Sequence, residues 1–236
     1  MALRRVFVDH VDDREAHAEG PTAHHLARVV RLREGEEVEL SDGRRLFRAH
    51  VAQADSLRVE FVIDQELAAI SSGPEVTLQI AVFQFSRFEW AVEKATELGV
   101  SRIVPVAAAR SESHLIKAAP KRLERWRRIA EQAAQQSRRL AAPTIEQMVP
   151  FEAVPDEGEG TRLILHPDGY PLGSVLRSSL EQPIQLLAGP EGGWTADEVS
   201  AAIREGYRHA DMGPLILRCE TAVIAALAAI GQALNR

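Results

Sequence analysis

Hydrophobic and polar positions follow two different patterns along this chain. In residues 1–65 they alternate over short runs such as EEVEL and LRVEF, which is typical of half-buried strands. Ser41-Asp42-Gly43 lies between two of these runs and predicts a hairpin turn, because glycine accepts a positive φ and aspartate bonds the backbone that follows it. This part of the chain predicts a small β-barrel or curled sheet with one short helix. Residues 66–75 lose the alternation and gain Ser, Gly and Pro, which predicts a linker.

From residue 76 onward, nearly continuous apolar runs alternate with helical patterns. The runs VTLQIAVF, SRIVPVA, TRLILH and PIQLLA suit strands that are covered on both faces. The segment SRFEWAVEKATELG predicts a helix that Ser86 and Glu89 cap at its start and Gly99 ends. Further helices are expected over residues 120–138, near 171–181, from TADEV onward and over 220–235. The alternation is that of an α/β domain with a mostly parallel sheet.

Composition excludes several classes of protein. The 236 residues are 45% hydrophobic and 26% charged, which is enough apolar material for globular cores. No apolar run approaches the roughly 18 residues of a membrane-spanning helix, and the charged opening MALRRVFVDH does not suit a signal peptide. The single cysteine, Cys219, excludes an internal disulfide and predicts a buried, inert thiol, and the eight histidines show no ligand spacing, so we expect no metal. A cytoplasmic protein is expected.

One basic segment stands out against the net charge of −6. Residues 117–139 carry eight basic and only two acidic side chains, together with Trp126. A solvated helix face is the more common meaning of such a run. A surface that faces RNA phosphates is the alternative.

The strongest local signal is PIQLLAGPEGGWTADEV at residues 183–199. An apolar strand runs into a glycine-rich turn from Gly189 to Gly193, and Thr195 with Glu198 predicts a capping box for the next helix. The turn therefore stands at the carboxyl end of a strand, where α/β sheets bind ligands, and its glycines let backbone groups approach a ligand closely. Neither common phosphate-loop motif is present. On these residues alone, a plain turn remains an alternative.

A second glycine turn, Met212-Gly213-Pro214, leads into LILRCETAVIAALAAIGQALN. Arg218 and Glu220 interrupt an otherwise apolar stretch, so they are expected to form an ion pair with each other or with another domain. Alternatively, Glu220 or Thr221 caps the last helix. That helix is apolar nearly all round. It predicts burial in a core or in a subunit interface.

Together the two glycine turns resemble a known signature. GPEGGWTADEV followed by MGPLILRCETAVIAAL is similar to the RsmE family, the 16S ribosomal RNA uridine-N3 methyltransferases of the knotted SPOUT class. VEKATELGVSRIVPV, RWRRIAEQAAQQSRR and HLARVVRLREGEEVELSDG match that family in order and spacing. The resemblance implies a PUA-like β-barrel over residues 1–70 that helps bind RNA. It also implies a SPOUT methyltransferase domain over residues 75–236, whose parallel sheet ends in a C-terminal trefoil knot, an exception to the usual rules of chain topology.

The resemblance also implies a reaction and its partners. A homodimer would methylate N3 of a uridine in 16S ribosomal RNA or the small ribosomal subunit, with S-adenosylmethionine as cofactor. The cofactor would lie on the backbone loops of the knot, at Leu165, His166, Pro167, Gly189, Pro190, Glu191, Gly192, Gly193, Met212, Gly213, Leu215, Ile216 and Leu217. A bulky residue at Gly192 is expected to block the cofactor.

Cationic side chains are the candidates for catalysis and for RNA contact. Arg218 lies within the second motif and Arg139 ends the family's EQ-Ser-x-Arg pattern, so either can stabilise charge on the uracil carbonyl oxygens. The residues expected to contact RNA are Arg31, Lys94, Arg110, Lys121, Arg122, Arg125 and Arg128. The chain departs from the family where Gln84 and Phe85 replace a common Lys-Gly pair, and where Arg138 replaces a frequent Gly.

Two alternatives to this function remain open. Another SPOUT enzyme, such as a transfer-RNA ribose methyltransferase, would use similar loops on a different acceptor. A non-catalytic RNA-binding protein of ribosome assembly would have lost methylation. Cofactor binding separates the second alternative from the enzymes, and the position of the methylated nucleotide separates the enzymes from each other.

Overall fold

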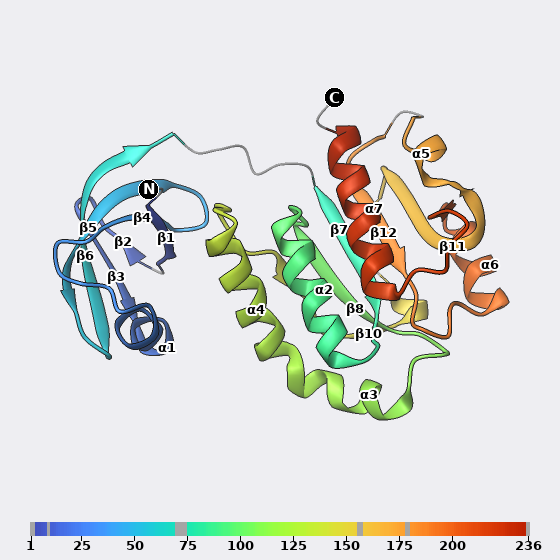
Figure 1. Ribbon diagram of the computed structural model, residues 1–236, viewed down its shortest axis with the longest axis horizontal. Helices are drawn as coiled ribbons and strands as arrows, with labels where there is room; N and C mark the ends of the chain where they lie inside the picture. The colour runs from blue at the N-terminus through green and yellow to red at the C-terminus, as the bar shows by residue number, and fades with distance from the viewer. Residues whose placement is uncertain (1–2, 9, 69–74, 155–157, 178–179, 235–236) are drawn as a thin grey trace. The chain divides into compact units, whose positions relative to one another are not determined.

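The computed structural model describes residues 3–8, 10–68, 75–154, 158–177 and 180–234. These residues form two compact units (Figure 1). The first unit combines Met1–Ser72 with Ala134–Ala142, and the second combines Gly73–Ala133 with Pro143–Arg236. Residues 134–142 therefore fold with the N-terminal part of the chain, although the sequence pattern assigned them to the C-terminal domain. Much of the predicted linker, residues 69–74, lies outside the described residues.

The first unit is built on a six-stranded sheet with the order β1-β4-β5-β6-β3-β2. Its elements are β1 (Arg4–Phe7), β2 (His10–Val11), β3 (Glu15–Glu19), α1 (Gly20–His24), the π-helical turn η1 (His25–Val30), β4 (Glu37–Ser41), β5 (Leu46–Ala54) and β6 (Arg58–Leu67). β1 and β4 are parallel, and the other neighbours are antiparallel. Val6, Leu40, Phe47 and Phe61 of the strands bury Leu26 of η1 in one core. The alternation in the sequence arises because every second side chain of these strands enters that core.

The predicted hairpin turn is confirmed between the antiparallel strands β4 and β5. Gly43 has a φ of +84°, and the N–H groups of Arg44 and Arg45 donate to Oδ1 of Asp42 at 2.9 and 2.6 Å. Burial opposes ionisation of Asp42, but these hydrogen bonds outweigh it and lower the pKa of the carboxyl. The turn is therefore held by a carboxylate that stays ionised in mildly acidic solution.

The chain leaves α4 (Leu123–Gln136) through a left-handed turn. The N–H of Arg138 donates to the carbonyl of Gln135 at 3.2 Å, and the N–H of Arg139 donates to the carbonyl of Ala134 at 2.9 Å. These two bonds define a Schellman motif, in which the residue with positive φ is usually glycine. Arg138 occupies that position here, with a φ of 60°.

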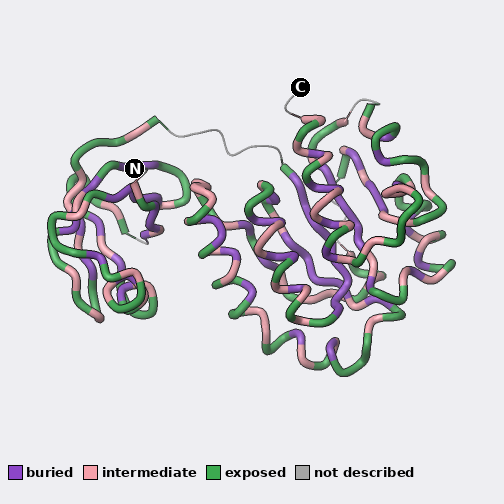
Figure 2. The backbone as a smooth tube through the Cα atoms, viewed as in Figure 1, coloured by how far each residue is buried: buried purple, intermediate pink, exposed green. Residues whose placement is uncertain are grey.

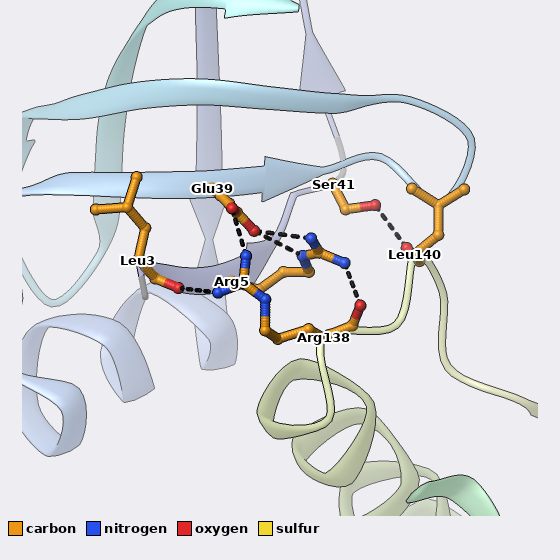
Figure 3. Close-up of polar contacts among 6 residues, drawn as sticks. All are labelled: Leu3, Arg5, Glu39, Ser41, Arg138 and Leu140. Carbon is orange, nitrogen blue, oxygen red and sulfur yellow. Dashed lines mark hydrogen bonds and ion pairs between the residues drawn. The ribbon is translucent and has the colours of Figure 1, made fainter. Parts of the chain in front are cut away.

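A buried carboxylate of the sheet holds Arg138 in this conformation (Figure 3). The guanidinium of Arg138 lies 2.5 Å from Oε1 of Glu39, and Glu39 also binds the buried Arg5 at 2.7 Å. Arg5 in turn donates to the carbonyl of Arg138, and Ser41 donates to the carbonyl of Leu140 at 2.5 Å. The segment after α4 is thereby tied to β1 and β4 through both its side chains and its backbone.

Substitutions at Arg138 separate the backbone strain from the ion pair. Arg138→Gly and Arg138→Ala both remove the guanidinium, but only alanine keeps the cost of a side chain at positive φ. We expect the glycine variant to be more stable than the alanine variant by about 1 kcal/mol. Glu39→Ala leaves the charge of buried Arg5 without its carboxylate partner and should cost about 3 to 5 kcal/mol. Urea unfolding of the full chain measures both differences, and equal midpoints for the two Arg138 variants would contradict the strain argument.

The second unit is an α/β domain on a seven-stranded sheet with the order β10-β8-β7-β12-β11-β13, and β9 pairs with β8. Its strands are β7 (Val76–Ala81), β8 (Arg102–Ala107), β9 (Thr144–Ile145), β10 (Val149–Pro150), β11 (Thr161–Pro171), β12 (Ile184–Ala188) and β13 (Arg208–Asp211). All the strand pairs described in this sheet are parallel. The predicted α/β class with a parallel sheet is confirmed.

Helices cover both faces of this sheet, so its strands are buried along most of their length (Figure 2). The helical elements are α2 (Phe85–Glu97), α3 (Ser113–Ala118), η2 (Ala119–Arg122), α4, η3 (Phe151–Ala153), α5 (Leu172–Val175), α6 (Ala196–Arg204) and α7 (Cys219–Leu234). The cores of the second unit show which helices share a face. One core joins Phe88 of α2, Trp126 of α4 and Val223 of α7, and a smaller one joins Trp194 and Ala202 at α6.

The predicted capping box at the start of α2 is wrong. α2 begins at Phe85, so Ser86 lies inside the helix, and no side chain caps the first turn. Glu89 instead binds Arg125 of α4 through both carboxylate oxygens, at 2.7 and 2.8 Å. The predicted end of the helix is confirmed, since Gly99 has a φ of +93°.

The other helices differ from the sequence pattern mainly in length. The capping box before α6 is confirmed, because Thr195 accepts from the N–H of Glu198 and the Glu198 carboxylate accepts from the N–H of Thr195 at 2.7 Å. Of the helix expected near 171–181, the described residues form the single turn α5, and residues 178–179 lie outside them. The basic helix expected over 120–138 is η2 followed by α4.

Candidate active site

Loops beside three neighbouring strands enclose a cavity of about 790 Å³ in the second unit. One loop interrupts β11, and the others follow β12 and β13, the two strands that pair with β11 on either side. Every residue that the sequence predicted for the cofactor lines this cavity except Gly192: Leu165, His166, Pro167, Gly189, Pro190, Glu191, Gly193, Met212, Gly213, Leu215, Ile216 and Leu217. Cys219 and Ala222 line it from the first turn of α7.

The loop within β11 lies directly against the backbone of β13. The two strands pair up to Leu165 and again at Tyr170, and the residues between leave the ladder. A Cβ atom at Gly169 would lie 2.8 Å from backbone atoms of Ala210 and Asp211, which is closer than a side chain can approach. Only glycine fits this position, so the loop is held against the sheet where it forms one wall of the cavity.

Arg110 holds the glycine-rich turn after β12. Its Nη1 donates to the carbonyls of Gly192 and Trp194 at 2.9 and 3.1 Å, and the N–H of Gly193 donates to the carbonyl of Pro190 at 2.8 Å. The sequence predicts an RNA contact for Arg110, whereas these hydrogen bonds support the cavity wall. A Cβ atom at Gly192 would lie 3.1 Å from the Cβ of Arg110. A bulky residue at Gly192 would therefore press on Arg110 instead of entering the cavity directly.

Two ring nitrogens near the cavity are buried without a hydrogen-bond partner among the described residues. Nε1 of Trp194 lies in the wall, 3.0 Å from where a Cβ of Gly189 would be, and Nε2 of His209 belongs to a ring stacked on that of His166, with 5.4 Å between the ring centroids. An indole N–H can only donate, and a buried donor without an acceptor costs free energy. The cavity therefore suits a ligand that brings hydrogen-bond acceptors as well as apolar surface.

The charges at the start of α7 pair differently from the expected Arg218–Glu220 contact. Glu220 is buried, and its Oε1 lies 3.7 Å from Nε of Arg87 on α2. Arg218 is exposed at the cavity, and its side chain makes no hydrogen bond or ion pair with the described residues. α7 begins at Cys219, so Glu220 lies within the helix and does not cap it. Arg87 also lines the cavity and is a site residue that the sequence analysis missed.

Cys219 is a neutral thiol in this environment. Burial raises the pKa of the thiol to about 12, and the negative charges of Glu191 and Glu220 add to the rise. The reactive thiolate forms only near that pH, so we expect iodoacetamide at pH 8 to leave the folded chain unmodified and to alkylate it once urea has unfolded it. Mass spectrometry measures both. Equal alkylation rates for the folded and unfolded chain would contradict the prediction.

Several side chains predicted to contact RNA have acidic partners. Arg122 and Arg125 both pair with Glu89, with nitrogen–oxygen distances of 3.7 and 2.7 Å. Lys94 donates to two glutamates of its own helix, and these hydrogen bonds raise its pKa. These three cations are therefore partly neutralised on the protein surface.

The remaining predicted cations lie in different surroundings. Lys121 belongs to η2, and Nε of Arg128 donates to the carbonyl of Glu124 at 3.4 Å. Arg31 is exposed, with a φ of 59°, in the first unit. Arg139 also belongs to the first unit, where burial lowers its pKa.

Known proteins resemble the whole chain. A family described as an RNA methyltransferase domain matches residues 71–231, and an RNA methyltransferase PUA domain matches residues 18–64. A protein of Mycobacterium bovis named ribosomal RNA small subunit methyltransferase E is 32% identical over 100% of this chain and 94% of its own length. The chain belongs to the ribosomal RNA small subunit methyltransferase E family.

Other known proteins resemble the chain in sequence and in structure. The protein of that name from Synechocystis is 34% identical over 90% of this chain and 71% of its own length. The crystal structure of the Neisseria gonorrhoeae enzyme bound to S-adenosyl methionine is 29% identical, with a TM-score of 0.85 over 98% of both chains. A Legionella pneumophila structure with the bound cofactor SAM is 26% identical, with a TM-score of 0.86 over 99% of this chain and 98% of that one. The match to the PUA domain agrees with the predicted N-terminal PUA-like domain.

Two features are missing from the described part of the chain. No helix there has the length and apolar character needed to cross a membrane. No three His, Cys, Asp or Glu side chains within those residues come close enough to one another to hold a metal ion.

Proposed function

We propose that this chain transfers a methyl group from S-adenosylmethionine to N3 of a uridine in 16S ribosomal RNA, in the cytoplasm. The observation that carries the proposal is the cavity at the carboxyl edge of the parallel sheet, formed by the loops that the sequence motifs predicted for the cofactor. The names of the relatives from Synechocystis and Mycobacterium bovis support a ribosomal RNA substrate. The Neisseria gonorrhoeae structure supports the cofactor.

The residues around the cavity fit this cofactor. Apolar side chains from Met212 to Leu217 suit the adenine ring, and Nε1 of Trp194 offers a donor that has no acceptor among the described residues. When bound, the cofactor supplies an activated methyl group, whose carbon bonds to N3 while the electron pair of its bond to sulfur stays on sulfur and the N3 proton leaves to water. The remaining work of the protein is to position the uridine and to stabilise charge.

Arg218 suits the second of these tasks. Loss of the N3 proton spreads negative charge onto the two flanking carbonyl oxygens of uracil, and a cationic donor aimed at them lowers the barrier. Arg218 is exposed at the cavity, and its side chain makes no hydrogen bond or ion pair with the described residues. Its guanidinium can therefore donate to one of these oxygens. Arg139 remains a second candidate from its motif, and its guanidinium stays charged despite the lowered pKa.

The target uridine has to be unpaired. N3 lies on the base-pairing edge, so a paired base must flip out before the methyl group can reach it. We assign capture of the surrounding RNA to the first unit, through its PUA domain, and to the basic residues of η2 and α4.

Mapping the modified nucleotide tests the proposal. Ribosomal RNA from a deletion strain should lack one N3-methyluridine of the parent strain, and the purified protein with labelled cofactor should restore it on small subunits or on 16S RNA. A missing methyl group on a transfer-RNA ribose would instead support the other SPOUT activity. No change in either RNA, together with failure to bind the cofactor, would support a non-catalytic ribosome-assembly protein.

We further assign the second unit to the SPOUT class, with a C-terminal trefoil knot. The support is the sequence signature together with the close passage of the loop at Gly169 past the backbone of Ala210 and Asp211. Such contact means that the β11 loop and β13 pack without side chains between them.

A homodimer is the expected assembly. Leu215 is 76% exposed and Ile216 is fully exposed beside the cavity, and large apolar side chains at one surface indicate a contact with another protein chain. Sedimentation at micromolar concentration should give about twice the 26.0 kDa chain mass. The matched variant Leu215→Ser/Ile216→Ser should shift the protein toward the monomer. A wild-type monomer with full methylation activity would contradict the dimer.

A further inference from the structure

A buried carboxylate lies next to the cavity without enough partners to satisfy it. The side chain of Glu220 is 8% exposed, and its Oε2 has no hydrogen-bond partner among the described residues. Its other oxygen faces Nε of Arg87 at 3.7 Å. Burying a carboxylate is unfavourable unless it is paired, so the structure keeps Glu220 in place at a cost that its one ion pair only partly offsets.

Arg87 faces that carboxylate through its Nε and also belongs to the cavity lining. It lies in the first turns of α2, its side chain is 35% exposed, and it lines the cavity. Its two terminal nitrogens donate to no described residue. The other cavity arginines differ from it, because Arg110 donates to two carbonyls of the glycine-rich turn and Arg218 has no ion-pair partner in the described chain.

We propose that Arg87 is a catalytic residue that donates to a uracil carbonyl oxygen during methyl transfer, and that Glu220 positions it. The inference rests on the proposed function. N3 lies between two carbonyl oxygens, and the developing negative charge spreads onto both. Arg218 and Arg87 supply one cationic donor for each oxygen. A guanidinium fixed by an ion pair loses less freedom when it binds the transition state than a mobile one. The buried carboxylate keeps Arg87 aimed into the cavity.

Variants at both positions test this assignment with single-turnover methylation of 16S RNA, cofactor binding by calorimetry and RNA binding by filter assay. Arg87→Gln should lower the methylation rate about 100-fold, as is typical for removal of one donor to a developing oxyanion. The affinities for cofactor and RNA should stay within about threefold of the wild-type values, because the lost hydrogen bond forms only in the transition state. Arg204→Gln, an exposed arginine of α6 outside this cavity, is the matched control and should keep the wild-type rate.

The role of Glu220 is tested by coupling. Glu220→Gln alone should slow methylation about tenfold, and in the Arg87→Gln background it should have no further effect. The double variant carries a neutral pair and keeps the fold even where Arg87→Gln alone leaves the buried Glu220 unpaired. Additive effects in this cycle would overturn the positioning role.

A more acidic acceptor gives a readout that a structural role would not change. Fluorine at C5 of uracil stabilises the N3 anion, so 5-fluorouridine RNA should need Arg87 less, and the loss caused by Arg87→Gln should shrink at least about threefold. An equal loss of methylation rate on both RNAs, or a wild-type rate for Arg87→Gln, would overturn the role of Arg87 and leave the proposed function standing. Methylation by the wild-type chain at an atom other than N3 would overturn the proposed function and this assignment together.

Discussion

Ala222→Phe should abolish binding of S-adenosylmethionine while the chain remains folded. Ala222 lies in the first turns of α7 and lines the cavity, and its helical backbone accepts a phenylalanine without strain. The ring would occupy the space that the cofactor needs, so we expect the affinity to fall at least about 100-fold, equivalent to about 2.7 kcal/mol. Calorimetry measures the affinity, and circular dichroism checks the fold.

A matched substitution on another helix shows whether the loss is specific. Ala196 is exposed at the start of α6 and lines neither this cavity nor the one beside α6. Ala196→Phe should bind the cofactor like the wild-type chain. Wild-type affinity in Ala222→Phe would place the cofactor elsewhere and remove the main support for the proposed function.

Arg218→Ala should lower the methylation rate about 100- to 1,000-fold, because it removes a donor from the developing oxyanion. RNA affinity should change little, since Arg218 is one side chain beside the cavity and not part of the basic segment. Single-turnover rates and filter binding at fixed salt separate the two effects. A loss of RNA binding that accounts for the lower rate would assign Arg218 to docking instead of catalysis.

The basic segment should show the opposite behaviour. Neutralising Lys121, Arg125 and Arg128 together should weaken RNA binding and reduce the slope of log affinity against log salt by about one to two units. The expected change is smaller than for three free cations, because Arg125 already pairs with Glu89. Affinities across a salt series measure the slope. An unchanged slope would mean that this helix face is only solvated or packed within the protein.

The cavity could be predicted largely from sequence because its signals are local. An apolar run followed by glycines marks the end of a buried strand, and Gly189 to Gly193 follow this pattern after β12. The strand before Met212-Gly213-Pro214, β13, is polar and shows no such pattern, so this turn is predicted from its resemblance to the family motif. The residues of these turns line the cavity because neighbouring parallel strands end at the same edge of the sheet.

Contacts between distant parts of the chain could not be predicted in this way. Glu220 pairs with Arg87 and not with its sequence neighbour Arg218, because α2 packs beside α7. Glu89 does not form the expected capping box, because Arg125 of α4 offers it a fully charged partner in place of a backbone amide. In both cases an ion pair with a side chain of another helix replaces the contact that the local sequence pattern predicts.

Residues 134–142 belong to the first unit, and this limits how the N-terminal domain can be exchanged between proteins. Glu39 and Arg5 bind Arg138, a residue that the chain reaches only after it has formed β7 and β8 of the second unit's sheet. Residues 1–72 therefore do not contain all the contacts that stabilise the N-terminal domain. A chimera that exchanges residues 1–72 alone would separate the buried Glu39–Arg5 pair from Arg138. The N-terminal sheet and the end of α4 must therefore be transplanted, and must diversify, together.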